Sequence, residues 1–174
     1  MKKVVVFFTL FAPAMICFGQ PAHETLKIMW PEEYKWKVGS NQDNSKTQLV
    51  EMVPGKETID KWTIMGTMVT IRGLKNVSMD AAMNATFSQA QQNAIDPVLT
   101  LVERNDTAKN AWIIFKIEAA KFKNDNTPES QLFYVIQGES ALYSNFVAIK
   151  QKTLSKEFVD KWAKIFESSQ LVDQ

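Results

Sequence analysis

The sequence of 174 residues contains a single cysteine, Cys17, and a single histidine, His23. A metal site built from imidazole or thiolate needs several such ligands, and Ser-His-Asp or Cys-His catalysis needs a positioned base. Because His23 lies near the start of the chain, where residues are usually solvated, we expect it to belong to a tail. The scarcity of both residue types predicts a protein without a metal site, without a cofactor and without a disulfide.

Arginine and clustered glycine are also scarce. Arg72 and Arg104 are the only arginines, and the formal net charge of the chain is +1. Nothing in this balance supplies the basic surface that neutralises phosphates, so nucleic acid is not an expected partner. The six glycines are scattered and form neither a GxGxxG nor a GxxxxGK[ST] pattern, which argues against a nucleotide site.

The N-terminus carries an export signal pattern. Lys2 and Lys3 precede an uncharged apolar stretch from Val4 to Phe18, which ends at the small residue Gly19. This layout is typical of a bacterial signal peptide. We predict a signal peptide over residues 1–19, with cleavage after Ala14 as the second choice, and a periplasmic or secreted mature protein.

Cys17 raises the alternative of a lipid anchor, because lipoproteins are cut immediately before an acylated cysteine. The residue before such a cysteine is normally small, whereas this chain has Ile16 there. Ala14 also stands where a leucine-like residue is usual. A cleaved signal without lipidation is therefore the prediction. The apolar stretch is shorter than the ~20 residues of a membrane-spanning helix, so the mature chain is expected to have no transmembrane segment.

Residues 20–174 show no repeat and no Pro/Gly/Ser-rich linker, and we interpret them as one domain. Alternating apolar residues predict strands, and apolar residues spaced by three and four predict helices. The predicted strands cover residues 34–38, 49–53, 62–71, 98–103, 111–118, 131–137 and 141–150. The predicted helices follow the capping residues Ser78 and Ser155. Short connections between consecutive strands imply antiparallel pairing. The predicted fold class is α+β, with an antiparallel β-sheet covered by two main amphipathic helices.

The chain also carries a family resemblance. The strand-rich centre, the segment VPGKETIDKWTIMGTMVT and the closing FVDKWAKIFESSQLV resemble small exported bacterial proteins of the PsbP-like fold. The resemblance covers most of the mature chain and implies a terminal amphipathic helix packed on an antiparallel sheet, a layered sandwich. It also implies a non-enzymatic accessory or binding module, and it carries over no functional residue. A cystatin-like curved sheet is the competing architecture.

The chain is rich in tryptophan and methionine, and most of these residues are expected in the core. Trp36 and Trp62 differ, because each lies in a predicted strand with polar neighbours. A large amphipathic ring in such a position suits a concave sheet face that contacts a ligand or partner. We therefore name Trp36 and Trp62 as the candidate ligand or partner surface.

Carboxylates can perform acid and base chemistry without histidine when their environments separate their pKa values. Glu51 and Glu118 are surrounded by apolar neighbours and are the candidate acid/base residues of this alternative. Strands alternate their faces, however, so both side chains can also point into water. The sequence favours a non-catalytic binding or accessory module of the bacterial envelope that binds an envelope protein or a small apolar ligand. The alternatives are a carboxylate-based hydrolase or lyase and a carrier of small apolar ligands.

Overall fold

The computed structural model describes residues 24–123 and 127–173; the predicted signal peptide, Cys17 and His23 lie outside them. The elements in chain order are β1 (Glu24–Lys27), η1 (Glu32–Tyr34), β2 (Lys37–Asp43), β3 (Thr47–Val53), β4 (Ile64–Arg72), α1 (Met79–Asn93), β5 (Ala94–Ile95), β6 (Val98–Asn105), β7 (Trp112–Ala119), β8 (Lys121–Phe122), β9 (Glu129–Gln137), β10 (Ala141–Ile149), α2 (Lys156–Glu167) and β11 (Gln170–Asp173). Seven strands form one antiparallel sheet in the order β2-β3-β4-β10-β9-β7-β6. The predicted α+β class is confirmed at this level.

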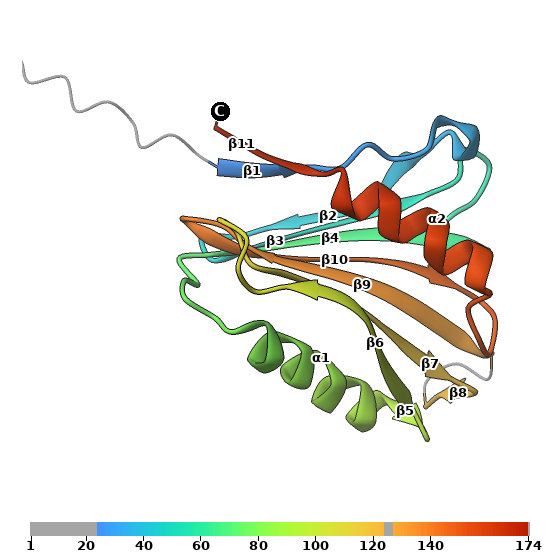
Figure 1. Cartoon of the computed structure of the whole chain (residues 1–174). Helices are drawn as coiled ribbons and strands as arrows, with labels where there is room; N and C mark the ends of the chain where they lie inside the picture. The colour runs from blue at the N-terminus through green and yellow to red at the C-terminus, as the bar shows by residue number, and fades with distance from the viewer. Residues whose placement is uncertain (1–23, 124–126, 174) are drawn as a thin grey trace, which may run out of the picture.

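The two helices lie on opposite sides of the sheet (Figure 1). Trp162 and Phe166 of α2 are fully buried together with Tyr134 and Val147 of the sheet, on what we call the α2 face. Met79 of α1 is buried with side chains of the opposite side, the α1 face. This arrangement follows from strand geometry, because successive side chains point to opposite faces and both faces of the central strands are apolar.

The helix boundaries follow from local sequence. The hydroxyl oxygens of Ser78 and Ser155 accept hydrogen bonds from the backbone N–H groups of Ala81 and Phe158, which satisfies one free donor at each helix start. Both serines were predicted as caps. The strand predicted for residues 62–71 is found as β4, where Ile64 packs into the core of the α2 face and Ile71 packs against that of the α1 face.

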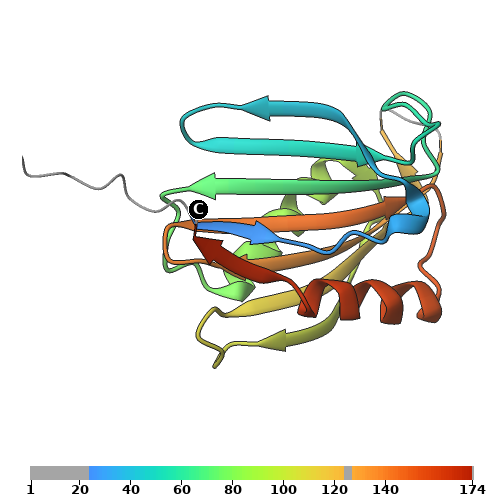
Figure 2. The ribbon, with the colours of Figure 1, turned by 90° about the horizontal axis from the view of Figure 1, so that it is seen from above.

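The two ends of the described chain meet on the α2 face. β1 pairs with β11 in a two-stranded antiparallel sheet that lies over the α2 face of the main sheet (Figure 2). The Tyr143 hydroxyl of β10 donates a 2.6 Å hydrogen bond to the Glu24 carbonyl oxygen, which ties β1 to the main sheet. Neither β1 nor β11 was predicted, because four-residue strands carry too little alternation to be recognised.

This contact makes stability depend on pH. Burial, and secondarily the Glu24 carboxylate, raise the pKa of Tyr143 from 10.0 to about 12. A raised folded-state pKa favours the neutral phenol, so this contribution is present below pH 10 and is lost as the pH rises toward 12. We expect the free energy of unfolding to fall less over this range in Tyr143→Phe than in the wild type, as measured by urea denaturation. Parallel curves for the two proteins would contradict this assignment.

Three sequence predictions differ from the structure near the tryptophans. Tyr34 ends a 3-10 turn, and Lys35 follows it with a φ of 49°, so β2 begins only at Lys37. Trp36 therefore lies outside any strand, and β2 continues to Asp43, beyond the predicted end of this strand at residue 38. Trp62 also precedes its strand, because β4 begins at Ile64. Among the residues described, no helix is long and apolar enough to cross a membrane.

Candidate functional site

Trp36, a predicted surface residue, lies in an aromatic cluster between the N-terminal segment and α2. The members of this cluster are Trp30, Tyr34, Trp36, Phe158, Trp162 and Phe166. The Trp36 ring centroid lies 5.0 Å from that of Tyr34 and 6.2 Å from that of Trp162. Trp36 is half-buried, and its contacts serve to pack α2 on the sheet.

Trp62, the second predicted surface residue, is half-buried two residues before β4 begins. The Lys150 ammonium lies 4.2 Å from the centroid of its ring, a cation–π geometry. The structure does not bring Trp62 together with Trp36 in an aromatic contact. Neither residue lines one of the three pockets described below.

The two candidate acid/base residues are also far apart. Glu51 lies on β3 and Glu118 on β7, with β4, β10 and β9 between those strands in the sheet. Glu118 Oε1 accepts a 2.7 Å hydrogen bond from the Leu154 backbone N–H, and its Oε2 lies 2.8 Å from the Lys116 ammonium. Both carboxylate oxygens of Glu118 therefore have partners, and the bond from Leu154 holds the β10–α2 connection against β7. These contacts favour a structural role for Glu118.

Removal of the Glu118 carboxylate is a direct test of that role. Leu154 is buried, so Glu118→Ala leaves its N–H without an acceptor and is expected to lower the free energy of unfolding by about 1–3 kcal/mol. Glu118→Gln keeps an acceptor oxygen and should lose less. Urea denaturation of the three proteins measures the difference. Equal stability of Glu118→Ala and the wild type would contradict the structural role and leave the Glu118 carboxylate as a candidate for acid/base chemistry.

The α1 face of the sheet is only half covered, because α1 packs chiefly against β7 and β9. Six strand spacings of about 4.8 Å separate the outer strands, whereas one helix is roughly 10 Å across, so a single helix cannot cover the sheet. The side of α1 toward β10 and β4 is bordered by two adjoining hollows of about 350 and 380 Å³. They share Val69, Thr86, Gln89, Phe133 and Phe146, and we call them together the α1 groove.

The α1 groove is lined by apolar side chains and contains no charged residue. Its floor includes Leu49, Val69 and Ile71, and its helical wall includes the small residues Ala81 and Ala85. These alanines leave room between the helix and the sheet. Polar groups are few and uncharged: the wider lining includes Thr86, Gln89, Asn93, Gln131 and Ser144. Such a hollow suits an apolar ligand with a few hydrogen-bonding contacts.

A row of cross-strand neighbours connects the covered and uncovered halves of this face. Phe115 stacks on Phe133 with ring centroids 5.0 Å apart, and Phe133 contacts Phe146 at 4.9 Å. Phe115 and Phe133 are buried, whereas Phe146 is only half-buried at the groove. Thr67 and Glu51 continue the row on β4 and β3. The apolar surface that α1 covers therefore extends beyond the helix into the groove.

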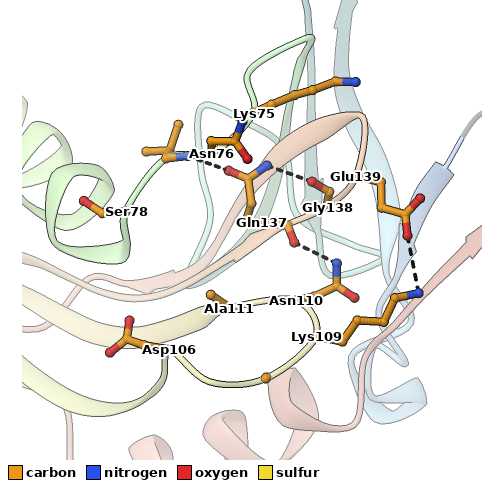
Figure 3. Close-up of a pocket in the computed structure, with 12 residues that line it drawn as sticks. Lys75, Asn76, Ser78, Asp106, Lys109, Asn110, Ala111, Gln137, Gly138 and Glu139 are labelled. Carbon is orange, nitrogen blue, oxygen red and sulfur yellow. Dashed lines mark hydrogen bonds and ion pairs between the residues drawn. The ribbon is translucent and has the colours of Figure 1, made fainter.

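A second hollow, which we call the polar pocket, lies at the N-terminal end of α1 (Figure 3). It has a volume of about 540 Å³. Its lining residues come from the β4–α1 loop, the β6–β7 loop and the β9–β10 turn: Lys75, Asn76, Val77, Ser78, Asp106, Ala108, Lys109, Asn110, Ala111, Gln137, Gly138 and Glu139. The pocket is thus formed where three connections meet at one end of the sheet.

The Gln137 side chain fixes these connections to one another. Its Oε1 accepts a 3.1 Å hydrogen bond from the Val77 N–H, and its Nε2 donates to the carbonyl oxygens of Leu74, Gly138 and Ala141. Its own carbonyl oxygen accepts from Asn110 Nδ2 at 2.9 Å. With its amide fully used, Gln137 acts as a scaffold for the pocket.

Most charges around the polar pocket are paired, with Lys75 as the exception. Arg104 contacts Asp106 and Asp80, and its hydrogen bond to Asp106 lowers the pKa of that carboxyl group. The Lys109 ammonium lies 3.3 Å from the Glu139 carboxylate. Among the described residues there is no group of three or more His, Cys, Asp or Glu side chains that could hold a metal ion.

Sequence reasoning identified the apolar stripe of α1 but not the groove beside it. Val69 and Phe146 fall in predicted strands, and Ala85 falls in the helix predicted to follow Ser78. No feature of the sequence specifies where α1 lies across the width of the sheet. The groove depends on that position.

No protein-family model matches this chain, and no characterised protein shows a significant sequence match to it. The geometry of the α1 groove and the polar pocket is therefore the basis for a functional proposal.

Proposed function

We propose that the protein is a non-catalytic binding module of the bacterial envelope and that it holds an apolar ligand in the α1 groove. The observation that carries this proposal is the uncharged apolar groove beside α1. It lies on the sheet face that α1 covers only in part. Removal of apolar surface from water stabilises a complex by about 25 cal/mol for each Å² buried. The groove offers this stabilisation without the cost of burying a charge.

Two further arguments support the proposal. The N-terminal sequence predicts export, which would place the module in the periplasm or outside the cell. The resemblance to PsbP-like proteins points to the same non-enzymatic class, and a sheet with a helix on each face is consistent with a layered PsbP-like sandwich. No contact of Glu51 or Glu118 favours the hydrolase or lyase alternative.

The test uses N-phenyl-1-naphthylamine, an uncharged apolar dye whose fluorescence rises when it leaves water. Titration of the purified protein should give a saturable increase in fluorescence. Ala85→Phe places a large ring in the groove and is expected to weaken dye binding at least tenfold. Asn84→Phe adds the same ring to the same helix at an exposed position outside the groove, and should bind the dye like the wild type.

Urea denaturation of both variants would verify that they are folded. A wild-type protein that does not bind the dye would overturn the proposal, as would equal affinities for Ala85→Phe and Asn84→Phe.

A further inference from the structure

The α1 groove and the polar pocket adjoin each other. Val77, in the loop that leads into α1, lines both hollows. Its backbone N–H is held by Gln137 Oε1, so this shared residue has a fixed position. Leu74 and Ala81 continue the lining on the groove side, and Asn76 and Ser78 do so on the polar side. The apolar hollow along α1 and the polar hollow at the start of the same helix thus share Val77 as a common wall residue.

The polar pocket does not select for a charged group. Lys109 is compensated by Glu139, and Asp106 is compensated by Arg104. An anion in the pocket would face the Asp106 and Glu139 carboxylates, and a cation would face Lys109. Lys75 also lines the pocket and makes no ion pair with a described residue, but its side chain extends away from Ser78 and Asp106 (Figure 3).

The positive end of the α1 helix dipole is compensated as well. Asp80 stands in the first turn of α1, where a negative charge is favourable, and it also contacts Arg104. The Ser78 hydroxyl oxygen already accepts the Ala81 N–H. The start of α1 therefore offers little net attraction for an anion.

Uncharged hydrogen-bonding groups remain available in the polar pocket. The Asn110 side chain uses Nδ2 to bind the Gln137 carbonyl oxygen, which leaves its Oδ1 as an acceptor. The Asn76 amide makes no side-chain hydrogen bond to any other described residue, and the Ser78 O–H is left as a donor. These groups suit hydroxyl groups better than they suit a charge.

We propose that the α1 groove and the polar pocket form one site for an uncharged amphiphile. Its apolar chain lies in the groove, and its hydroxyl-bearing head group binds in the polar pocket. The inference rests on the proposed function, because it takes the groove as the ligand site and adds the chemical class of the ligand. A neutral head is favoured because Asp106, Lys109 and Glu139 already have partners of opposite charge, so a charged head would give up its hydration for little attraction.

The test is displacement of N-phenyl-1-naphthylamine by three amphiphiles with the same twelve-carbon chain, each used below its micelle concentration. These probes are monolauroylglycerol with a neutral head, laurate with an anionic head and dodecyltrimethylammonium with a cationic head. We expect monolauroylglycerol to displace the dye at an at least tenfold lower concentration than either charged probe. Displacement by laurate or by the ammonium probe at an equal or lower concentration would overturn the inference.

A variant of the polar pocket adds a second readout. Ala108 lines this pocket and not the groove, so Ala108→Phe should weaken monolauroylglycerol at least fivefold relative to the dye. Asn84→Phe, outside both hollows, should leave the ratio of the two affinities unchanged. An unchanged ratio of the two affinities in folded Ala108→Phe would contradict head-group binding in the polar pocket, although the groove could still be the ligand site. A wild-type protein that binds no dye would overturn the inference and the proposed function together.

Discussion

Trp162→Ala is expected to lower the free energy of unfolding by about 3–5 kcal/mol, the range found when a fully buried large aromatic residue is truncated. Trp162 is inaccessible to solvent and contacts Trp30, with ring centroids 5.6 Å apart, and Phe166, at 6.0 Å. Removal of its ring leaves a cavity between α2 and the N-terminal segment. Because most domains are stable by only 5–15 kcal/mol, the variant would lie close to unfolding.

Urea denaturation followed by circular dichroism measures this loss. Trp162→Phe is the informative control, because the buried indole N–H of Trp162 has no hydrogen-bond partner in the described part of the chain. Trp162→Phe therefore reduces the side-chain volume but breaks no hydrogen bond, and it should lower the free energy of unfolding clearly less than Trp162→Ala does. A matched truncation of the exposed Lys164→Ala on the same helix should change stability by less than about 0.5 kcal/mol. If Trp162→Ala were as stable as Lys164→Ala, α2 would not be the docked helix described above.

The sequence patterns that proved reliable are those generated by packing on one element. Phe158, Trp162 and Phe166 recur at a spacing of four, and the structure buries this stripe against the sheet. The same holds for Met65, Val69 and Ile71 of β4, which share the α1 face. The spacing of apolar residues indicates which side of a helix or strand is apolar. It can be recognised from a few neighbouring residues, without knowledge of the rest of the chain.

The patterns that failed are those whose cause lies elsewhere in the chain. Tyr34 and Trp36 alternate with charged residues as in a strand, yet their burial comes from α2, more than a hundred residues later. Residues 39–43 of β2 are mostly polar and gave no strand signal, because β2 is an edge strand that has a partner on one side only. An edge strand needs no continuous apolar face.

The candidate site was also hard to predict from the sequence, because its contacts join residues that are far apart in the chain. Glu118 was recognised as a carboxylate among apolar neighbours, but its partner, the Leu154 N–H, is 36 residues away. The α1 groove depends on the lateral position of α1, and the polar pocket depends on three loops held by Gln137. The use of Trp36 and Trp62 as a ligand or partner surface stays a prediction, and the groove now offers a site on the other side of the sheet from the Trp36 cluster.

Gly66→Ala is expected to lower the free energy of unfolding by about 1–3 kcal/mol, although alanine is normally tolerated in a strand. Gly66 is buried on the α2 face of β4, where a Cβ atom would lie 2.5 Å from Cζ3 of Trp30. Trp30 contacts Trp36 and Trp162, so it cannot move without disturbing the aromatic cluster. The near-ultraviolet circular dichroism of the variant should change as well.

A double-mutant cycle separates this steric effect from a general cost of alanine at position 66. Trp30→Leu removes the ring that the new Cβ would meet, at the expense of part of the aromatic cluster. In that background Gly66→Ala should cost much less than it does in the wild type, and the coupling should be at least about 1 kcal/mol. An equal cost in both backgrounds would mean that glycine is required by the strand itself. A large coupling would mean that Gly66 is needed for the close approach of Trp30, which connects the N-terminal segment to the sheet beneath α2.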